Sequence, residues 1–126
     1  YKWFTTADGV LQKNNPENFL YTVPSKLLSL IQQKDFGQYA DADGELHTCF
    51  ITNCHTTGGN SGSPVFDADG NLIGTNFDRV WEGTMSDIYF NPDICRNVSV
   101  DIRYTLFLID KFAGAGYLLD EMKLVK

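Results

Sequence analysis

The chain has 126 residues, a net charge of −6 and an isoelectric point near 4.6. Its length and its 43% hydrophobic content suffice for one domain with a modest core and exclude an intrinsically disordered chain. The acidic balance disfavours nucleic acid as the main partner, because phosphate binding needs a basic face. No apolar run approaches the roughly 20 residues that a membrane-spanning helix needs, so we expect no membrane span.

The start of the chain and its cysteines narrow the interpretation further. The chain does not begin with Met and has no signal-peptide pattern at Tyr1, so we expect a processed or engineered boundary and a fragment of a longer protein. Cys49, Cys54 and Cys95 lack metal-ligand spacing, and their odd number disfavours a disulfide framework. We expect buried free thiols, while the sequence leaves a disulfide open. We expect no metal and no cofactor.

The first half of the chain predicts short strands and one helix. Residues 1–22 alternate apolar and polar positions between turn signals, which favours two short strands joined by turns. Residues 24–31 have helical spacing, with Pro24 in the first turn. A turn is expected at residues 41–44, and a strand at residues 48–53, where aromatic and β-branched side chains gather.

The middle of the chain predicts a loop followed by a β-hairpin. Small and polar residues form the loop 56–63. Strands at 64–66 and 72–77 flank a turn at 67–71 that contains Asp-Gly-type signals. A further strand is expected at residues 98–100.

The end of the chain changes to helical periodicity. Ile102, Leu106, Ile109 and Phe112 lie on one face of an amphipathic helix, which glycines at 114 and 116 would end. Residues 118–122 suggest a short final helical turn. The fold expected for residues 1–126 is therefore one mainly β, antiparallel domain that is closed by a C-terminal α-helix.

The loop contains the residues best suited to chemistry, in the segment Gly58-Gly59-Asn60-Ser61-Gly62-Ser63-Pro64. A serine nucleophile needs donors for the oxyanion that forms on attack, and the N–H groups of Gly59 and Ser61 are the natural donors here. The segment resembles the nucleophile loop of chymotrypsin-like peptidases. The alternative is a Gly/Ser turn that merely precedes a hairpin. In members activated by cleavage, an Asp in the place of Asn60 receives the new N-terminal amine, so the resemblance implies no such activation.

A catalytic serine also needs a base, and the chain has two histidines, His47 and His55. His55 lies six residues before Ser61, whereas in the chymotrypsin arrangement His and Asp precede the serine by a whole barrel. We expect both histidines to be structural or surface residues and the catalytic His and Asp to lie outside this chain. The alternative is a self-contained hydrolase with His55 as base.

Longer stretches are similar to the bacterial dipeptidyl-peptidase 7 and 11 family, chymotrypsin-fold serine exopeptidases of serine peptidase family 46 known from Bacteroidetes. The matching stretches are residues 35–40, 56–65, 72–78, 100–104, 109–115 and 121–122. The resemblance implies that the chain is the second, nucleophile-bearing barrel of a double β-barrel, with the first barrel and a helical cap domain absent. It also implies a periplasmic enzyme that removes dipeptides from peptide N-termini, and a homodimeric full-length form.

The resemblance assigns roles to two adjacent residues, Asp78 and Arg79. Asp78 matches the position that binds the substrate's α-amino group. Members with Arg in the place of Arg79 prefer Asp or Glu at P1, and a guanidinium can hold a carboxylate in a bidentate pair. The alternative is that Arg79 is a solvated turn residue.

Asp87 is expected to be a surface or turn carboxylate. The neighbours expected to contact substrate are Thr75, Asn76 and Phe77, with Trp81, Glu82 and Gly83 as further lining residues. A non-catalytic binding or scaffold module is the alternative function.

Overall fold

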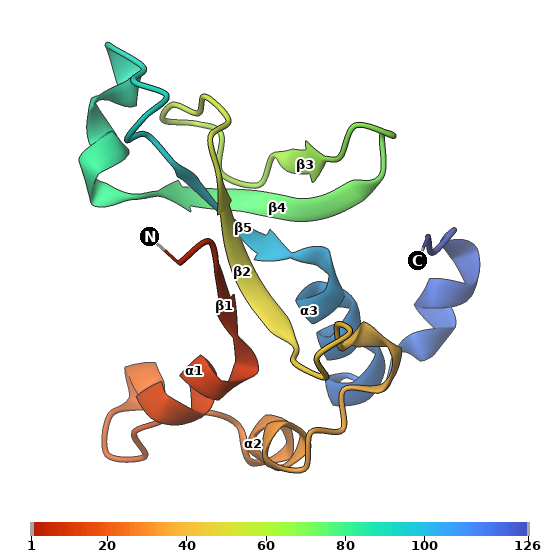
Figure 1. Cartoon of the computed structure of the whole chain (residues 1–126). Helices are drawn as coiled ribbons and strands as arrows, with labels where there is room; N and C mark the ends of the chain where they lie inside the picture. The colour runs from red at the N-terminus through yellow and green to blue at the C-terminus, as the bar shows by residue number, and fades with distance from the viewer. Residues whose placement is uncertain (1, 126) are drawn as a thin grey trace. The chain divides into compact units, whose positions relative to one another are not determined.

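A computed structural model describes residues 2–125 and divides them into two compact units (Figure 1). One unit comprises residues 2–4 and 49–102, and the other comprises residues 5–48 and 103–125. Five described strands form a sheet in the order β1-β2-β5-β4-β3. The strands are β1 (Phe4–Thr6), β2 (His47–Thr52), β3 (Pro64–Phe66), β4 (Leu72–Arg79) and β5 (Asn97–Asp101).

The sheet confirms the predicted mainly β, antiparallel class but not a closed barrel. The pairings of β2 with β5, β5 with β4, and β4 with β3 are all antiparallel. The sheet stays open, because β1 and β3 lie at its two ends with three residues each. Short edge strands of this kind limit unwanted pairing with other chains. That residues 1–126 form a single domain remains a prediction.

The prediction of two strands within residues 1–22 is wrong for most of that segment. After β1 the chain forms α1 (Ala7–Lys13) and, further on, the 3₁₀ turn η1 (Phe19–Tyr21). Asp8-Gly9, one of the turn signals expected within residues 1–22, instead lies in the first turn of α1, where the carboxylate of Asp8 complements the helix dipole. Ala7 is fully buried and donates its N–H to the carbonyl of Leu46 at 2.9 Å, which anchors the start of the helix.

The unit that contains α1 holds most of the apolar core. The predicted helix is confirmed as α2 (Ser25–Gln32), and Leu27 and Ile31 are its buried residues. The predicted C-terminal helix is confirmed as α3 (Ile102–Phe107) followed by a π-helical turn, η4 (Leu108–Phe112). The rings of Phe36 and Phe107 pack edge to face with centroids 5.9 Å apart, and both side chains are nearly fully buried. The final turn is η5 (Gly116–Glu121).

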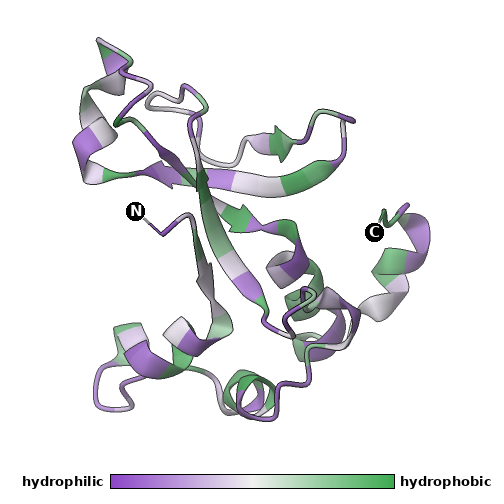
Figure 2. Cartoon of the chain, in the orientation of Figure 1, coloured by the Kyte–Doolittle hydropathy of each residue, from purple (hydrophilic) through white to green (hydrophobic). Residues whose placement is uncertain are grey.

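The other unit carries the hairpin of β3 and β4. The strand β4 runs to Arg79, two residues beyond the prediction. Its pairing with β5 shifts between Asn76 and Asp78, which leaves Phe77 as the extra residue of a β-bulge. In Figure 2 the ribbon of β4 passes from green at its start to mostly purple at its end, so hydrophobic character gives way to polar character along the strand. The bulge therefore lies where the polar end of β4 begins.

The structure also bears on the state of the three cysteines and on the expected absence of a membrane-spanning helix. Cys49, Cys54 and Cys95 are free in the structure, as expected, but Cys95 alone of the three is buried and Cys54 is exposed. Cys54 lies in the open loop after β2, where no strand pairing covers it. Within residues 2–125 no helix is both long and apolar enough to span a bilayer.

Candidate active site

The loop between β2 and β3 is held against β4 by the backbone of Asn76. The N–H of Gly62 donates to the carbonyl of Asn76 at 2.8 Å, and the N–H of Asn76 donates to the carbonyl of Ser63 at 2.9 Å. Gly59 and Gly62 have φ angles of +97° and +86°, a region that other residues rarely adopt. Glycine at these positions therefore lets the loop turn tightly on either side of the serine.

Asn60 closes the first half of this loop with its side chain. Its Oδ1 accepts a hydrogen bond from the backbone N–H of Thr57 at 2.7 Å. A side-chain oxygen that bonds to a nearby N–H in this way stabilises a tight turn. Asn60 thus has a local role that needs no charged partner.

Ser61 lies in a pocket of about 160 Å³. Its hydroxyl is exposed and donates to the carbonyl of Phe77 at 3.3 Å, a long hydrogen bond to the bulge of β4. The N–H groups of Gly59 and Ser61 donate to no other residue within the described range 2–125. The residues that line the pocket are Thr56, Thr57, Gly58, Gly59, Ser61, Asn76, Phe77, Asp78 and Arg79.

The structure brings most of the predicted site residues into that pocket. Ser61, Gly59, Asp78 and Arg79 line it together, although they come from two segments of the sequence. Asn76 and Phe77 also line it, whereas the lining does not include Thr75. Nor does it include Trp81, Glu82 and Gly83, the further residues proposed from the sequence, which lie in the 3₁₀ segment η3 (Trp81–Asp87) after β4.

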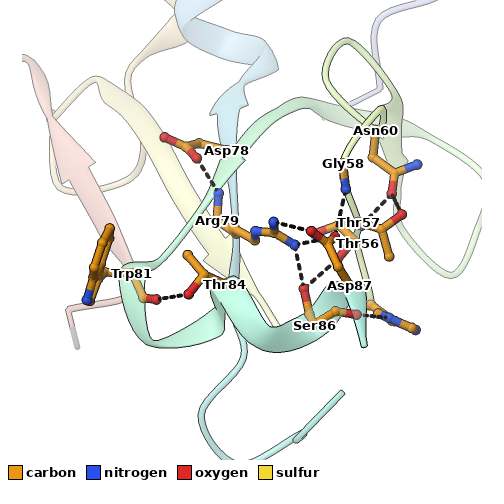
Figure 3. Close-up of polar contacts among 11 residues, drawn as sticks. Thr56, Thr57, Gly58, Asn60, Asp78, Arg79, Trp81, Thr84, Ser86 and Asp87 are labelled. Carbon is orange, nitrogen blue, oxygen red and sulfur yellow. Dashed lines mark hydrogen bonds and ion pairs between the residues drawn. The ribbon is translucent and has the colours of Figure 1, made fainter. Parts of the chain in front are cut away.

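Arg79 forms a bidentate ion pair with Asp87 (Figure 3), which is an exposed carboxylate, as expected, but also has this specific partner. The two guanidinium nitrogens Nη1 and Nη2 donate to Oδ1 and Oδ2 at 2.7 and 2.8 Å. Nη1 also donates to the hydroxyl of Ser86 at 2.9 Å. The alternative considered for Arg79, a solvated turn residue, does not fit these contacts, since the side chain is fixed in a network.

Asp87 also binds the loop that contains Ser61. Its Oδ1 accepts the backbone N–H of Gly58 at 2.9 Å, and the hydroxyl of Ser86 donates to the carbonyl of Thr56 at 2.7 Å. The Arg79 guanidinium and then the Gly58 N–H hold the pKa of the Asp87 carboxyl well below its usual range, because both favour the charged form. The side chains of η3 thus connect Arg79 to the backbone just before Ser61.

Ser86, Asp87 and Thr56 are site residues that sequence reasoning did not assign. Asp87 lies eight residues after Arg79 in an irregular segment, so no helical or strand period relates the two. A cation followed by a nearby carboxylate is a weak signal that many surface segments share. The conformation of η3 brings Asp87 to Arg79, and the sequence alone does not predict that conformation.

Neither histidine binds Ser61 within the described residues. The imidazole of His55 stacks on Phe90, with centroids 4.7 Å apart, and its Nε2 lies 3.0 Å from the carbonyl oxygen of Ser86. His55 lines a second pocket of about 260 Å³ rather than the Ser61 pocket. His47 belongs to the other unit, where its Nε2 lies 2.6 Å from Oδ2 of Asp41. The expected structural role of both residues fits these contacts.

Serine hydrolases use sites of this kind, in which an exposed serine lies on a loop between antiparallel strands and nearby backbone N–H groups donate no hydrogen bond to the protein. The chain belongs to the Peptidase S46 family, whose model matches residues 1–124.

The chain is similar to several curated dipeptidyl peptidases. It is 60% identical over 126 residues to the Asp/Glu-specific dipeptidyl-peptidase of Capnocytophaga gingivalis, and 48% identical over 126 residues to dipeptidyl-peptidase 7 of Phocaeicola vulgatus. The crystal structure of Porphyromonas endodontalis DPP11 with the dipeptide Arg-Asp matches 98% of the chain, at 49% identity and a TM-score of 0.94. All of the chain aligns with these two relatives, but it spans only 18% of the length of each, and 18% of the DPP11 chain.

Proposed function

We propose that this chain carries the nucleophile and the specificity residues of a serine dipeptidyl peptidase that removes dipeptides from peptide N-termini and prefers Asp or Glu at P1. The observation that carries the proposal is one pocket lined by Ser61, Gly59, Asp78 and Arg79. The names of the relatives support the same activity, since both Asp/Glu-specific dipeptidyl-peptidases and dipeptidyl-peptidase 7 align over the whole chain.

The proposed chemistry is acyl transfer through Ser61. The hydroxyl oxygen attacks the carbonyl carbon of the second peptide bond from the N-terminus, while a base takes the hydroxyl proton. The N–H groups of Gly59 and Ser61 stabilise the oxyanion of the tetrahedral intermediate. The amine of the remaining peptide leaves with the proton, and a water then attacks the acyl-enzyme ester to release the dipeptide.

Asp78 and Arg79 would set the length and the side chain of the dipeptide. The exposed carboxylate of Asp78 pairs with the substrate's α-ammonium group, which restricts cleavage to a fixed distance from the N-terminus. Arg79 receives the P1 carboxylate. Asp87 occupies its Nη1 and Nη2, while Nε and the remaining Nη2 hydrogen form no hydrogen bond with residues 2–125, so a second bidentate edge stays available.

The base and its orienting carboxylate would come from another part of a longer, periplasmic protein. This chain covers 18% of the C. gingivalis relative, which leaves ample sequence for a first barrel and a cap domain. The partners are then peptide substrates and the rest of the same polypeptide, and not nucleic acid. The whole enzyme would form a homodimer. The solved DPP11 complexes with Arg-Asp and Arg-Glu support a peptide ligand.

Fluorogenic dipeptide substrates and a covalent serine probe test the proposal on the whole protein. We expect cleavage of a substrate with Asp at P1, labelling by a fluorophosphonate, and loss of both in Ser61→Ala. Ser63→Ala is the matched control, since this serine lies in the same loop but does not line the Ser61 pocket. A protein that folds yet neither cleaves nor reacts with the probe is the non-catalytic binding module instead.

A further inference from the structure

A row of amides lies beneath the nucleophile loop and has no part in the proposed chemistry so far. Asn97 on β5 and Asn76 on β4 are 1% and 4% exposed. Positions this buried are usually apolar, because an amide costs free energy in the interior unless its hydrogen bonds are satisfied. Here they are satisfied by one another, by the hydroxyls of Thr52 on β2 and Ser99 on β5, and by the carbonyl of Asn60 in the loop.

The hydrogen bonds of this row run in one direction. The carbonyl of Asn60 can only accept, so Asn76 presents its Nδ2 to it, at 3.0 Å. Oδ1 of Asn76 therefore faces Asn97, whose Nδ2 donates to it at 3.1 Å. Oδ1 of Asn97 in turn accepts from the hydroxyl of Thr52. Each group thus determines which end of the next amide points toward the loop.

The last link of the row controls the direction of the Ser61 N–H group. The peptide bond between Asn60 and Ser61 is trans, so its C=O and its N–H lie in one plane and point in opposite directions. The carbonyl is held by Nδ2 of Asn76 and by the N–H of Ser63 at 3.1 Å. A flip of this peptide would break both bonds and would turn the Ser61 N–H toward the row.

We propose that Asn97 and Asn76 are positioning residues that hold the Ser61 N–H in place as an oxyanion donor by fixing the Asn60 carbonyl. The inference rests on the proposed function, because it needs an oxyanion to be stabilised. Asn97 acts only through Asn76, since it does not line the Ser61 pocket. Preorganised donors of this kind contribute to catalysis because they need not reorient when charge develops.

Asn97→Leu in the whole enzyme tests this role, because leucine has a similar size and shape but no donor. Oδ1 of Asn76 loses its partner, and the amide no longer has a preferred end toward Asn60. Loss of a whole oxyanion donor costs about 100- to 1,000-fold in kcat, so loss of its support should lower kcat by about 10- to 100-fold. KM should change little. If Asn97→Leu does not fold, Thr52→Val interrupts the same row at its outer end and should lower kcat by about 10-fold.

Inhibitor binding separates positioning from general damage to the fold. A dipeptide aldehyde forms a tetrahedral adduct with the serine and needs the oxyanion donors, whereas the product dipeptide does not. The variants should lose affinity for the aldehyde by the same factor as kcat and keep their affinity for the product. Thr48→Val is the control, because it removes a hydroxyl bond to Thr5, 2.8 Å long, from the same strand without touching the row.

The outcomes distinguish this inference from the proposed function. Unchanged kcat in a folded Asn97→Leu or Thr52→Val enzyme, or an equal loss of affinity for aldehyde and product, overturns the positioning role. A Ser61→Ala enzyme that remains active, or a wild-type protein that cleaves no dipeptide substrate, overturns the proposed function itself.

Discussion

The contact with Asp87 fixes the side chain of Arg79, the residue that we propose to bind the P1 carboxylate. An exposed arginine would pay side-chain entropy to bind a substrate carboxylate, because its long side chain has many rotamers. Here Asp87 and Ser86 already fix the guanidinium, with three hydrogen bonds of 2.7 to 2.9 Å. The low pKa of the Asp87 carboxyl, held by Arg79, keeps this pair charged at every pH where a P1 carboxylate is itself charged.

Arg79→Gly in the whole enzyme should abolish the preference for Asp and Glu at P1 and allow hydrophobic P1 residues. A charge-assisted bond contributes about 1.5–3 kcal/mol, so kcat/KM for a P1 Asp substrate should fall about 10- to 100-fold. The measurement is the ratio of kcat/KM for P1 Asp and P1 Leu substrates.

Arg79→Lys is the matched control for the Arg79→Gly variant. It keeps the positive charge but loses the planar fork, so it should fall between the wild type and Arg79→Gly. An unchanged Asp-to-Leu ratio in Arg79→Gly would show that the selectivity resides elsewhere.

At the scale of elements, close approach between strands positions the hairpin that carries the loop. A Cβ built on Gly74 of β4 would lie 2.6 Å from the ring of Phe50 and 2.6 Å from the carbonyl oxygen of Val100. The absence of a side chain at this position therefore lets β2, β5 and β4 pack closely. This packing holds β4, and with it Asn76, Asp78 and Arg79, against the rest of the sheet.

Gly74→Ala should destabilise the protein by about 1–3 kcal/mol, because the added methyl group overpacks a site bounded by backbone. Gly9→Ala is the control: it lies in α1, nothing lies within 4 Å of its added Cβ, and alanine favours the helix by about 0.5–1 kcal/mol. Thermal unfolding should give a lower midpoint for Gly74→Ala and an equal or higher one for Gly9→Ala. Equal midpoints for the two variants would contradict the close approach.

At the scale of the whole molecule, the described residues include the proposed nucleophile, the two proposed oxyanion donors and the proposed specificity groups, but no base that contacts Ser61. Oxyanion stabilisation without a base leaves weak chemistry. The chain covers only 18% of the length of these relatives, so we propose that the base lies in another part of the whole protein.

The isolated chain should therefore cleave dipeptide substrates no faster than its own Ser61→Ala variant. The whole protein should cleave them with full activity under the same conditions. Initial rates with a P1 Asp fluorogenic substrate provide the comparison. An isolated chain with substantial activity that Ser61→Ala removes would point to His55 as the base, and His55→Ala would then abolish it.

The sequence by itself determined most of the local structures and indicated the loop that contains Ser61. Helical spacing in α2 and α3, and turn residues between β3 and β4, act over a few residues, so they are visible without a fold. The same local logic was wrong for residues 7–13, because a short alternation of apolar and polar residues does not distinguish a strand from a helix whose first residue is buried.

The tertiary structure decided the contacts that complete the site. The pairing of Arg79 with Asp87 depends on the turn of η3, and that of Asn76 with Asn97 depends on the register of β4 against β5 and on the bulge at Phe77. No sequence period encodes such contacts, because they join residues whose distance is set by strand pairing rather than by chain spacing. The local sequence was therefore enough to propose Ser61 as the nucleophile, whereas the orientation of the groups around it depends on the tertiary structure.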